Sequence, residues 1–417
     1  MLASGTTSCA VPGPRVTART KVGADKGEQM SYTLKVDATK WRDHLSAMNE
    51  ATKRTTGANI VGVVKGNGYG FGQSLLAGEA DRLGLATVAV GTVFEISDVL
   101  AGFYGDVIVL EPFEPRDTAA ATAWWMAGQR HDASRIVRTV ASEAALRALI
   151  DGPGAVRILL EAKTSMHRFG FGEADLLRLL ADPAVRGALS SGHAQVLGLS
   201  LHLPVAQPAD EVSIHGVANG TARVREVTRW AGLWQAETAV WSGSHAPAST
   251  VWLSHLDDAE LAAVARTADE LAIRARIGTR LWLGKRAALT ASGTVLAVHP
   301  LPNGSHVGYQ QRTGPKDSTL VVVSGGTAHG IGLSAPTPAA SLRQRAVTAG
   351  TGVLDAAGRA LSPFSWAGKQ RWFAEPPHQH HSMLWLPRGC VIPAVGDVFP
   401  AEVRFTTSRF DAVLGLD

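Results

Sequence analysis

The alternation between short apolar runs and helix-like stretches is the feature of this chain that most restricts its fold. From residue 31, β-branched apolar runs alternate with stretches rich in alanine, leucine and arginine that have a helical period. This pattern is typical of strand–helix units around a parallel sheet. The candidate strands are Ile60–Lys65, Thr87–Gly91, Asp106–Leu110, Arg135–Val140, Val156–Glu161, Val196–Leu201, Thr250–Leu253 and Ala272–Arg276.

Eight such units favour an α/β fold of the TIM type, a (β/α)8 barrel. A doubly wound sheet is the rival, but no GxGxxG motif follows the first strand. After Gly284 the helix-like stretches become rare, and glycine, proline and asparagine separate the apolar runs. We therefore predict a barrel over residues 31–284 and a mostly β C-terminal domain over residues 285–417. The strand-like runs of that domain are Val295–Val298, Thr319–Val323, Ser382–Leu386 and Val398–Phe405.

The first thirty residues differ from the rest of the chain. Met1–Gln29 has no hydrophobic periodicity and lacks the apolar core of a signal peptide. The sequence predicts a disordered tail over residues 1–30, with Met30 as an alternative start.

Composition narrows the partners and the compartment. The net charge of +4 is small and dispersed, which argues against a nucleic-acid partner. No apolar run approaches the roughly 20 residues that a membrane span needs. The two cysteines, Cys9 and Cys390, form no disulfide framework, and this favours a cytoplasmic location.

The most informative motif is IVGVVKGNGYGFG, residues 60–72, where an apolar run ends in Lys65 and a glycine-rich turn holds Tyr69. A lysine that is partly desolvated at a strand end can lose its proton, and a neutral amine can form a Schiff base. A lone lysine at this place is usually an ordinary surface side chain, but the tyrosine flanked by glycines favours a functional role.

This segment resembles the pyridoxal 5'-phosphate (PLP) lysine motif of the alanine racemase family. The resemblance implies PLP bound to Lys65, with Tyr69 among the cofactor ligands. It also implies a barrel followed by a β domain, with the opening strand Tyr32–Val36 joining the β domain.

The fifth candidate strand ends in Glu161 and continues as AKTSMHRFGF, which is similar to a substrate-binding segment of the same family. The resemblance assigns Arg168 to the substrate carboxylate, and a guanidinium suits that role because it binds a carboxylate with two parallel hydrogen bonds. Met166 and Gly170 also match. Glu161 stands where many members carry a carbamylated lysine, and we expect its charge to hold Arg168; a solvated carboxylate is an equal alternative.

Three later strands resemble the family's cofactor-binding segments. His202, at the end of VLGLSLHLP, is expected to stack on the cofactor ring, and Ser254 in VWLSHL is a looser match to a phosphate ligand. In IRARIGTRLWLG, Arg276 takes the place of the arginine that faces the pyridine nitrogen. Gly278 and Thr279 follow, and their backbone N–H groups would bind the phosphate.

The segment SHVGYQQRT resembles the part of the family that carries a second catalytic base, and Tyr309 matches it. A racemase needs one base on each face of a planar carbanion, because a single base returns the proton to the same face. Lys65 and Tyr309 would be that pair. In the family this tyrosine reaches the lysine of another subunit, so the resemblance implies a homodimer with shared active sites.

Two segments depart from the family. GGTAHG places Thr327 where the family has a tyrosine whose hydroxyl binds phosphate. The usual Cys-Met-Asp-Gln segment is replaced by HQHHSML, with His378, His380 and His381. No acidic or cysteine ligand flanks these histidines at a recognisable spacing, so a metal site is not favoured.

The sequence therefore indicates a PLP-dependent amino-acid racemase that interconverts L- and D-amino acids. A decarboxylase or D-amino-acid lyase on the same fold is the first alternative, although Tyr309 argues against it. A non-catalytic PLP-binding protein is the second, because the Thr327 and His380 regions are altered.

Overall fold

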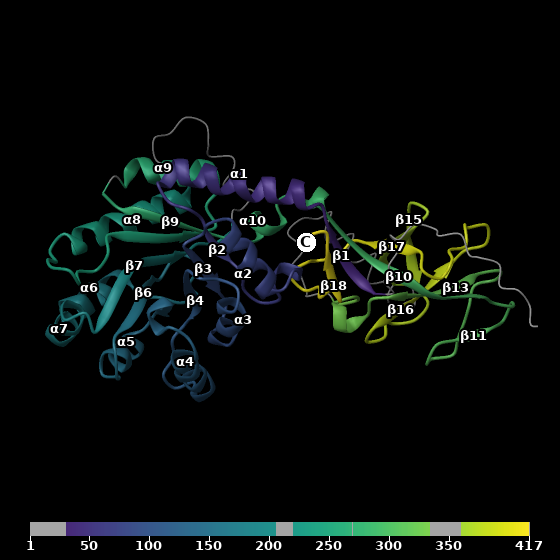
Figure 1. The fold of residues 1–417 in the computed structure, drawn as a ribbon, viewed down its shortest axis with the longest axis horizontal. Helices are drawn as coiled ribbons and strands as arrows, with labels where there is room; N and C mark the ends of the chain where they lie inside the picture. Colours follow the sequence, from purple (N-terminus) through teal and green to yellow (C-terminus); the bar gives the residue numbers. More distant parts are fainter. Residues whose placement is uncertain (1–30, 206–219, 269, 334–359, 417) are drawn as a thin grey trace, which may run out of the picture.

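The chain folds into two parts, a barrel and a β sheet that lies beside it (Figure 1). The structure is a computed structural model, and it describes residues 31–205, 220–268, 270–333 and 360–416. The predicted α/β class, a (β/α)8 barrel followed by a mostly β domain, is confirmed. The tail predicted for residues 1–30 lies outside the described residues.

Eight parallel strands, β2 to β9, form the closed barrel in chain order, and β9 pairs with β2 to complete it. All eight predicted strands are present, with small differences at their ends. Apolar side chains such as Val61, Ile108 and Trp252 fill the interior of the barrel. The strands are β2 Val61–Val63, β3 Thr87–Val90, β4 Asp106–Pro112, β5 Ile136–Val140, β6 Val156–Ala162, β7 Ala194–His202, β8 Thr250–Ser254 and β9 Ala272–Ile277.

Helices surround the barrel, and several begin at a side chain that caps their free backbone N–H groups. Asp37 accepts from the backbone N–H of Lys40 at the start of α1, and Asp257 forms a capping box with Glu260 at the start of α9. The helices are α1 Ala38–Thr56, α2 Gln73–Arg82, α3 Ile96–Leu100, α4 Thr118–Arg130, α5 Glu143–Ile150, α6 Glu173–Ala181, α7 Pro183–Ser190, α8 Ala222–Thr238, α9 Asp258–Thr267 and α10 Thr279–Leu283.

The second part is an eight-stranded sheet in which β13, β16, β15, β14, β17 and β10 follow one another, and β10 pairs again with β13. Buried residues such as Val295, Phe364 and Phe399 form its core. A separate hairpin, β11 with β12, projects from it. The strands are β1 Tyr32–Val36, β10 Leu289–Pro300, β11 His306–Val307, β12 Arg312–Thr313, β13 Thr319–Ser324, β14 Leu361–Trp366, β15 Lys369–Phe373, β16 His381–Leu386, β17 Val398–Ala401 and β18 Ala412–Leu414.

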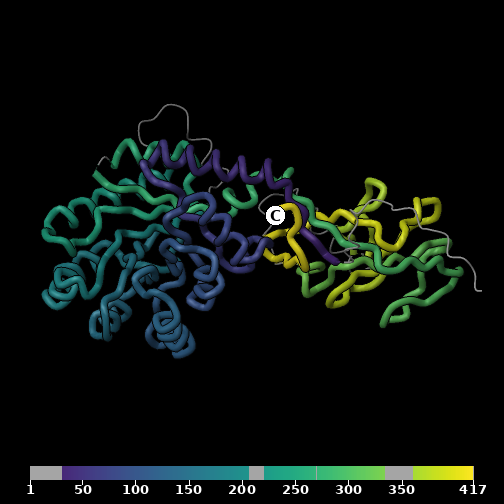
Figure 2. Tube along the Cα trace, in the orientation of Figure 1, coloured from purple at the N-terminus to yellow at the C-terminus, as the bar shows by residue number. Residues whose placement is uncertain are grey.

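Both ends of the described chain meet at the junction of the two parts. β1 pairs with β10 antiparallel and with β18 parallel, so the first strand belongs to the second sheet. Figure 2 shows the yellow C-terminal segment beside the purple N-terminal strand there. We propose a domain boundary near Gly284, because α10 ends at Leu283 and β10 begins at Leu289.

The end of the predicted strand Val398–Phe405 is wrong, since β17 stops at Ala401. The chain then turns towards the barrel, where Phe405 is buried in the barrel's core. Strands β14 and β15 were not predicted. Their sequences, LSPFSW and KQRWF, are too polar to give a clear apolar run.

The described residues contain neither a helix that could span a membrane nor a cluster of metal-binding side chains. No helix in the described ranges is long and apolar enough to cross a membrane. No group of three or more His, Cys, Asp or Glu side chains in that part of the chain is arranged to hold a metal ion. The cytoplasmic location and the lack of a nucleic-acid partner stay predictions from the sequence.

Candidate active site

The register of the barrel strands places predicted site residues next to one another. His202 at the end of β7 lies opposite Ser254 at the end of β8, and Ser254 lies opposite Arg276 on β9. Lys65 follows β2, which pairs with β9 and so closes the barrel at this point. Because the strands are parallel, all four residues reach the C-terminal rim, where loops build the functional sites of such barrels.

A cavity of about 550 Å³ opens at this rim. Side chains from both ends of the barrel sequence line it, together with Thr406 from the C-terminal segment. Sequence reasoning did not single out Arg223, His255 or Asp257, which also line it. The predicted residues in its wall are Lys65, Tyr69, His202, Ser254, Arg276, Gly278 and Thr279.

Lys65 lies in a cationic environment. Partial burial, together with the positive charges of Arg168 and Arg276, lowers the pKa of the Lys65 amine, while Glu95 acts in the opposite direction. Glu95 is held in place by the backbone N–H groups of Gly66 (3.2 Å) and Gly91 (2.7 Å). A lowered pKa increases the fraction of neutral, nucleophilic amine at neutral pH.

Tyr69 packs tightly against the turn that follows β9. Its φ of 53° lies in the left-handed region, and its hydroxyl bonds to the side chain of Thr279. A Cβ atom at Gly278 would lie 2.0 Å from the Tyr69 hydroxyl oxygen, so only glycine permits this approach. Burial raises the pKa of Tyr69 to about 12, which keeps the phenol protonated at neutral pH.

Arg276 and Glu161 are joined through Ser200. Arg276 donates from Nη1 to Ser200 Oγ (2.8 Å) and from Nη2 to the carbonyl of Leu201 (2.9 Å), and Ser200 donates to Glu161 Oε2. Burial raises the pKa of Glu161, and the charge of Arg276 opposes this. No hydrogen bond or ion pair of the described residues joins Glu161 to Arg168. The Nε atom of Arg276 is buried and has no hydrogen-bond partner in the described part of the chain.

His202 stays neutral at any working pH. Burial and the positive charges of Arg276 and Arg168 lower its pKa to about 2. Its Nδ1 lies 3.3 Å from Ser254 Oγ, and its ring packs edge-on against His255 at 4.9 Å between centroids. His255 has a φ of 66°, an uncommon conformation for a residue other than glycine. This conformation cannot be read from the sequence.

Arg168 and Met166 lie on a loop that leaves β6 and returns to it. Backbone bonds from Phe171 to Glu161 and from Lys163 to Phe171, each 2.8 Å, close this loop. Arg168 and Met166 are exposed and do not line the cavity, but the charge of Arg168 reaches Lys65 and His202. Arg168 is thus placed beside the cavity. Its charge also acts to lower the pKa of Glu161, but no ion pair within 4.0 Å joins it to a carboxylate of the described residues.

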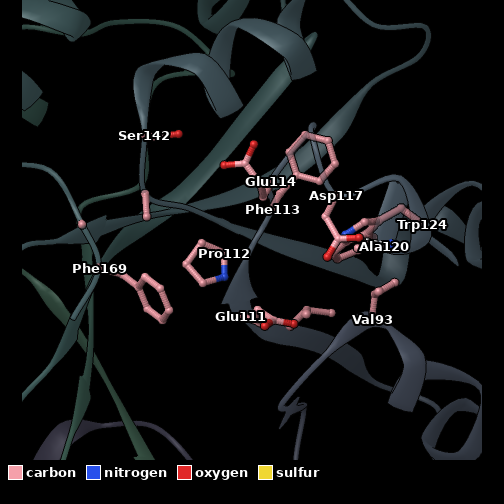
Figure 3. Close-up of a pocket in the computed structure, with 13 residues that line it drawn as sticks. Val93, Glu111, Pro112, Phe113, Glu114, Asp117, Ala120, Trp124, Ser142 and Phe169 are labelled. Atoms are coloured by element: carbon pink, nitrogen blue, oxygen red, sulfur yellow. Dashed lines mark hydrogen bonds between the residues drawn. The ribbon is translucent and has the colours of Figure 1, made fainter. Parts of the chain in front are cut away.

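A second pocket of about 320 Å³ lies at the same rim, on the other side of this loop. Figure 3 shows Phe169 on one side of it and Trp124 on the other, with Pro112 between them in this view. Its carboxylates include Glu111 and Asp117. None of the predicted catalytic or cofactor-binding residues lines it, so the candidate active site is the larger cavity.

The second predicted base lies far from this cavity within one chain. Tyr309 follows β11 in the β domain, at the end of the molecule away from the barrel, and is 86% exposed (Figure 1). Its ring lies 4.6 Å from that of His378, which bonds to Glu375 (2.6 Å) and to His381 (3.0 Å). Thr327 also lies in the β domain and does not line the cavity.

Comparison with known proteins gives this arrangement a context. The family described as "Alanine racemase, N-terminal domain" matches residues 36–262, more than half of the chain. The alanine racemase of Nitratidesulfovibrio vulgaris is 28% identical over 285 residues, which are 66% of this chain and 70% of that protein.

Solved structures share the fold along most of the chain. The alanine racemase of Bartonella henselae with covalently bound pyridoxal phosphate has a TM-score of 0.58 at 15% identity, covering 89% of this chain and 90% of that one. The histidine racemase of Leuconostoc mesenteroides has a TM-score of 0.54 at 17% identity, covering 91% and 89%. By the family match and the shared fold, this chain belongs to the alanine racemase family.

Proposed function

We propose that this protein is a PLP-dependent amino-acid racemase that interconverts L- and D-amino acids, with alanine as the first candidate substrate. The observation that carries the proposal is the gathering of Lys65, Tyr69, His202, Ser254, Arg276, Gly278 and Thr279 around one cavity. These residues come from opposite ends of the barrel sequence, and a closed parallel barrel is what brings them together.

The residues present fit PLP. Arg276 lines the cavity, and its buried Nε has no partner among the described residues, as expected of a donor that awaits a ligand acceptor. Neutral His202 offers an uncharged ring at the same wall, and Gly278 leaves the backbone open beside Tyr69. Lys65 would hold the cofactor, which when bound withdraws electrons from the substrate α-carbon and so acidifies its proton.

The protein's own residues would then position the substrate and move the proton. Arg168, exposed beside the cavity, would bind the substrate carboxylate. Lys65 Nζ would take or return the α-proton on one face, and the Tyr309 hydroxyl would do so on the other. Arg276 would offer a permanent positive charge to the cofactor, which would limit side reactions.

Tyr309 can serve this site only if it comes from a second chain. Within one chain it lies at the end of the β domain away from the barrel (Figure 1). Its 86% exposure leaves the ring available to a partner. A homodimer in which each β domain reaches the other barrel would complete two equivalent sites.

The proposal is tested by incubating the PLP-loaded protein with L-alanine in heavy water. A racemase produces D-alanine that carries deuterium at the α-carbon. Release of carbon dioxide would instead establish a decarboxylase. In a parallel incubation with serine, release of pyruvate and ammonia by elimination would establish a lyase. Bound PLP without exchange of any amino-acid α-proton would identify a non-catalytic PLP-binding protein. Histidine is the natural second substrate to test, because a histidine racemase shares the fold.

Mixing two inactive variants tests the shared site. Lys65→Ala and Tyr309→Phe should each be inactive alone, but a mixed dimer keeps one intact site that is built from Lys65 of one chain and Tyr309 of the other. After complete subunit exchange of equal amounts, activity should return to about one quarter of the wild-type value, because half of the dimers are mixed. No recovery after proven exchange, or an active monomer, would contradict this model.

Glu161→Gln tests the buried chain from Glu161 through Ser200 to Arg276. The amide keeps the shape but cannot carry the charge that faces Arg276 across Ser200. A hydrogen bond to a charged group contributes about 1.5–3 kcal/mol, so we expect kcat/KM to fall by about 10- to 100-fold. Ser200→Ala, which removes the bridging hydroxyl and no charge, is the matched comparison. Wild-type kinetics for Glu161→Gln would show that its charge is not used.

A further inference from the structure

Arg223 is a buried arginine in the wall of the candidate active site. It lies in the first turn of α8, only 5% of its surface is exposed, and it lines the cavity. Burial of a guanidinium is costly unless its charge and its five N–H donors find partners. Each of its N–H donors therefore needs an acceptor.

One side of the guanidinium is occupied by Glu260, which is itself only 4% exposed. Arg223 donates to Glu260 from Nε (3.1 Å) and from Nη2 (2.8 Å to each carboxylate oxygen). Glu260 is fixed in turn by the hydroxyl of Thr221 (2.5 Å) and the backbone N–H of Asp257 (3.1 Å). The ion pair is therefore rigidly held.

The other side of the guanidinium is unused. Nη1 of Arg223 is buried and has no hydrogen-bond partner among the residues that the structure describes. Leaving such a donor without an acceptor costs free energy, and unpaired buried donors call for a missing ligand or water. Because Glu260 fixes the guanidinium, this donor is preorganised at the cavity wall.

The wall around Arg223 attracts an anion. Its described charged residues are Lys65, Arg223, Arg276, Arg280 and Asp257. Two carboxylates outside the wall, Glu260 and Asp258, pair with Arg223 and Arg280, which leaves Lys65 and Arg276 against Asp257. Arg280 is more exposed than Arg223, but its guanidinium is also half-used: Nη1 pairs with Asp258 (2.8 Å), while Nη2 is buried and has no partner in the described ranges. An excess of positive charge in a concave site raises the local concentration of anions.

The position of Arg223 points to the phosphate end of the cofactor rather than to the reacting carbon. Its counter-ion, Glu260, belongs to the capping box of α9, which follows Ser254, the last residue of β8, along the chain. Arg280 directly follows Gly278 and Thr279 in the sequence. Ser254, Gly278 and Thr279 are phosphate ligands expected from the sequence. Arg168, beside Lys65, is the guanidinium left for a substrate carboxylate.

We propose that Arg223, oriented by Glu260, donates through Nη1 to the phosphate of PLP. This proposal rests on the proposed function, because it needs PLP in the cavity. It also explains how the chain binds a phosphate although Thr327, the expected hydroxyl ligand, lies outside the cavity. The charge-assisted bond replaces a neutral one and acts on the cofactor, not on the reacting atoms.

The test compares PLP with pyridoxal, which lacks the phosphate. Affinities of the apoprotein for both are measured by absorbance titration for the wild type and for Arg223→Gln, with the exposed neighbour Arg225→Gln as the matched control. For Arg223→Gln we expect the PLP dissociation constant to rise about 10- to 100-fold, the scale of one hydrogen bond between charged groups. Pyridoxal affinity should stay the same, and Arg225→Gln should change neither.

Arg223→Gln leaves Glu260 buried without its partner, so the double variant Arg223→Gln/Glu260→Gln is measured as well. Its two amides can bond to each other, which avoids an unpaired buried charge. Inorganic phosphate gives a second readout, since it should raise the melting temperature of the wild-type apoprotein but not that of the double variant.

The outcomes separate this proposal from the proposed function. Equal losses of PLP and pyridoxal affinity would show that Arg223 is merely structural. An unchanged preference for PLP, with a raised KM for aspartate or glutamate, would assign Arg223 to an acidic substrate and overturn the proposal. A wild-type protein that binds no PLP would refute the proposed function itself.

Discussion

Lys65→Ala is expected to abolish covalent attachment of PLP and to remove racemisation altogether. Lys65 is the lysine in the cavity wall, and its lowered pKa favours the neutral amine that attachment requires. The variant loses both the anchor of the cofactor and one of the two proposed bases. No other lysine lies among the described residues that line the cavity, so none of these can replace it.

The measurement is borohydride reduction of the PLP-loaded protein followed by peptide mass spectrometry. In the wild type the added mass should lie on the peptide that contains Lys65, and Lys65→Ala should acquire none. Lys163→Ala is the matched control, because Lys163 is an exposed lysine on the loop beside the same rim. A single PLP adduct on another lysine in Lys65→Ala would overturn the assignment.

Tyr309→Phe is expected to lower racemisation by at least about 10²–10⁴-fold, the usual contribution of a general acid–base group. The change removes one hydroxyl from a ring that is 86% exposed, so the fold and the affinity for PLP should be unaffected. Lys65 would still act on its own face of the substrate. In heavy water, deuterium should therefore enter one enantiomer slowly while the other does not form.

Tyr104→Phe provides the comparison for Tyr309→Phe. Tyr104 is also highly exposed (78%), but it lies in the barrel part and is neither of the two proposed bases. Its removal should leave the rate unchanged. If Tyr309→Phe racemises as fast as the wild type, Tyr309 has no part in proton transfer, and another group must supply the second base.

The barrel and much of its candidate site could be predicted from the sequence because the determinants are local. Each barrel strand is a short apolar run between helix-like stretches, and its end is marked by a polar residue such as His202 or Arg276. Parallel strands in a closed barrel place those ends at one rim, so residues distant in sequence were expected to meet there. The register of β7, β8 and β9 shows that they do.

Hydrogen-bond partners could not be predicted in the same way, because they depend on distances between elements. The sequence led us to expect the charge of Glu161 to hold Arg168. The charge of Arg168 does act on Glu161, but the hydrogen-bond partner of Glu161 is Ser200, which faces it from β7. Arg223 and Glu260 lie on different helices, and neither has a motif around it that marks a site. Only the packing of α8 against α9 reveals that they form a buried pair.

The sequence alone determined which residues are predicted to bind the cofactor and transfer the proton, since Lys65 and Tyr309 each stand in a recognisable local segment. The tertiary structure decided which of them share a cavity. It placed Lys65 in the cavity wall and Tyr309 at the end of the β domain that lies away from the barrel, because the β11–β12 hairpin projects in that direction. Proximity between side chains is set by the packing of whole elements, and no local pattern encodes it.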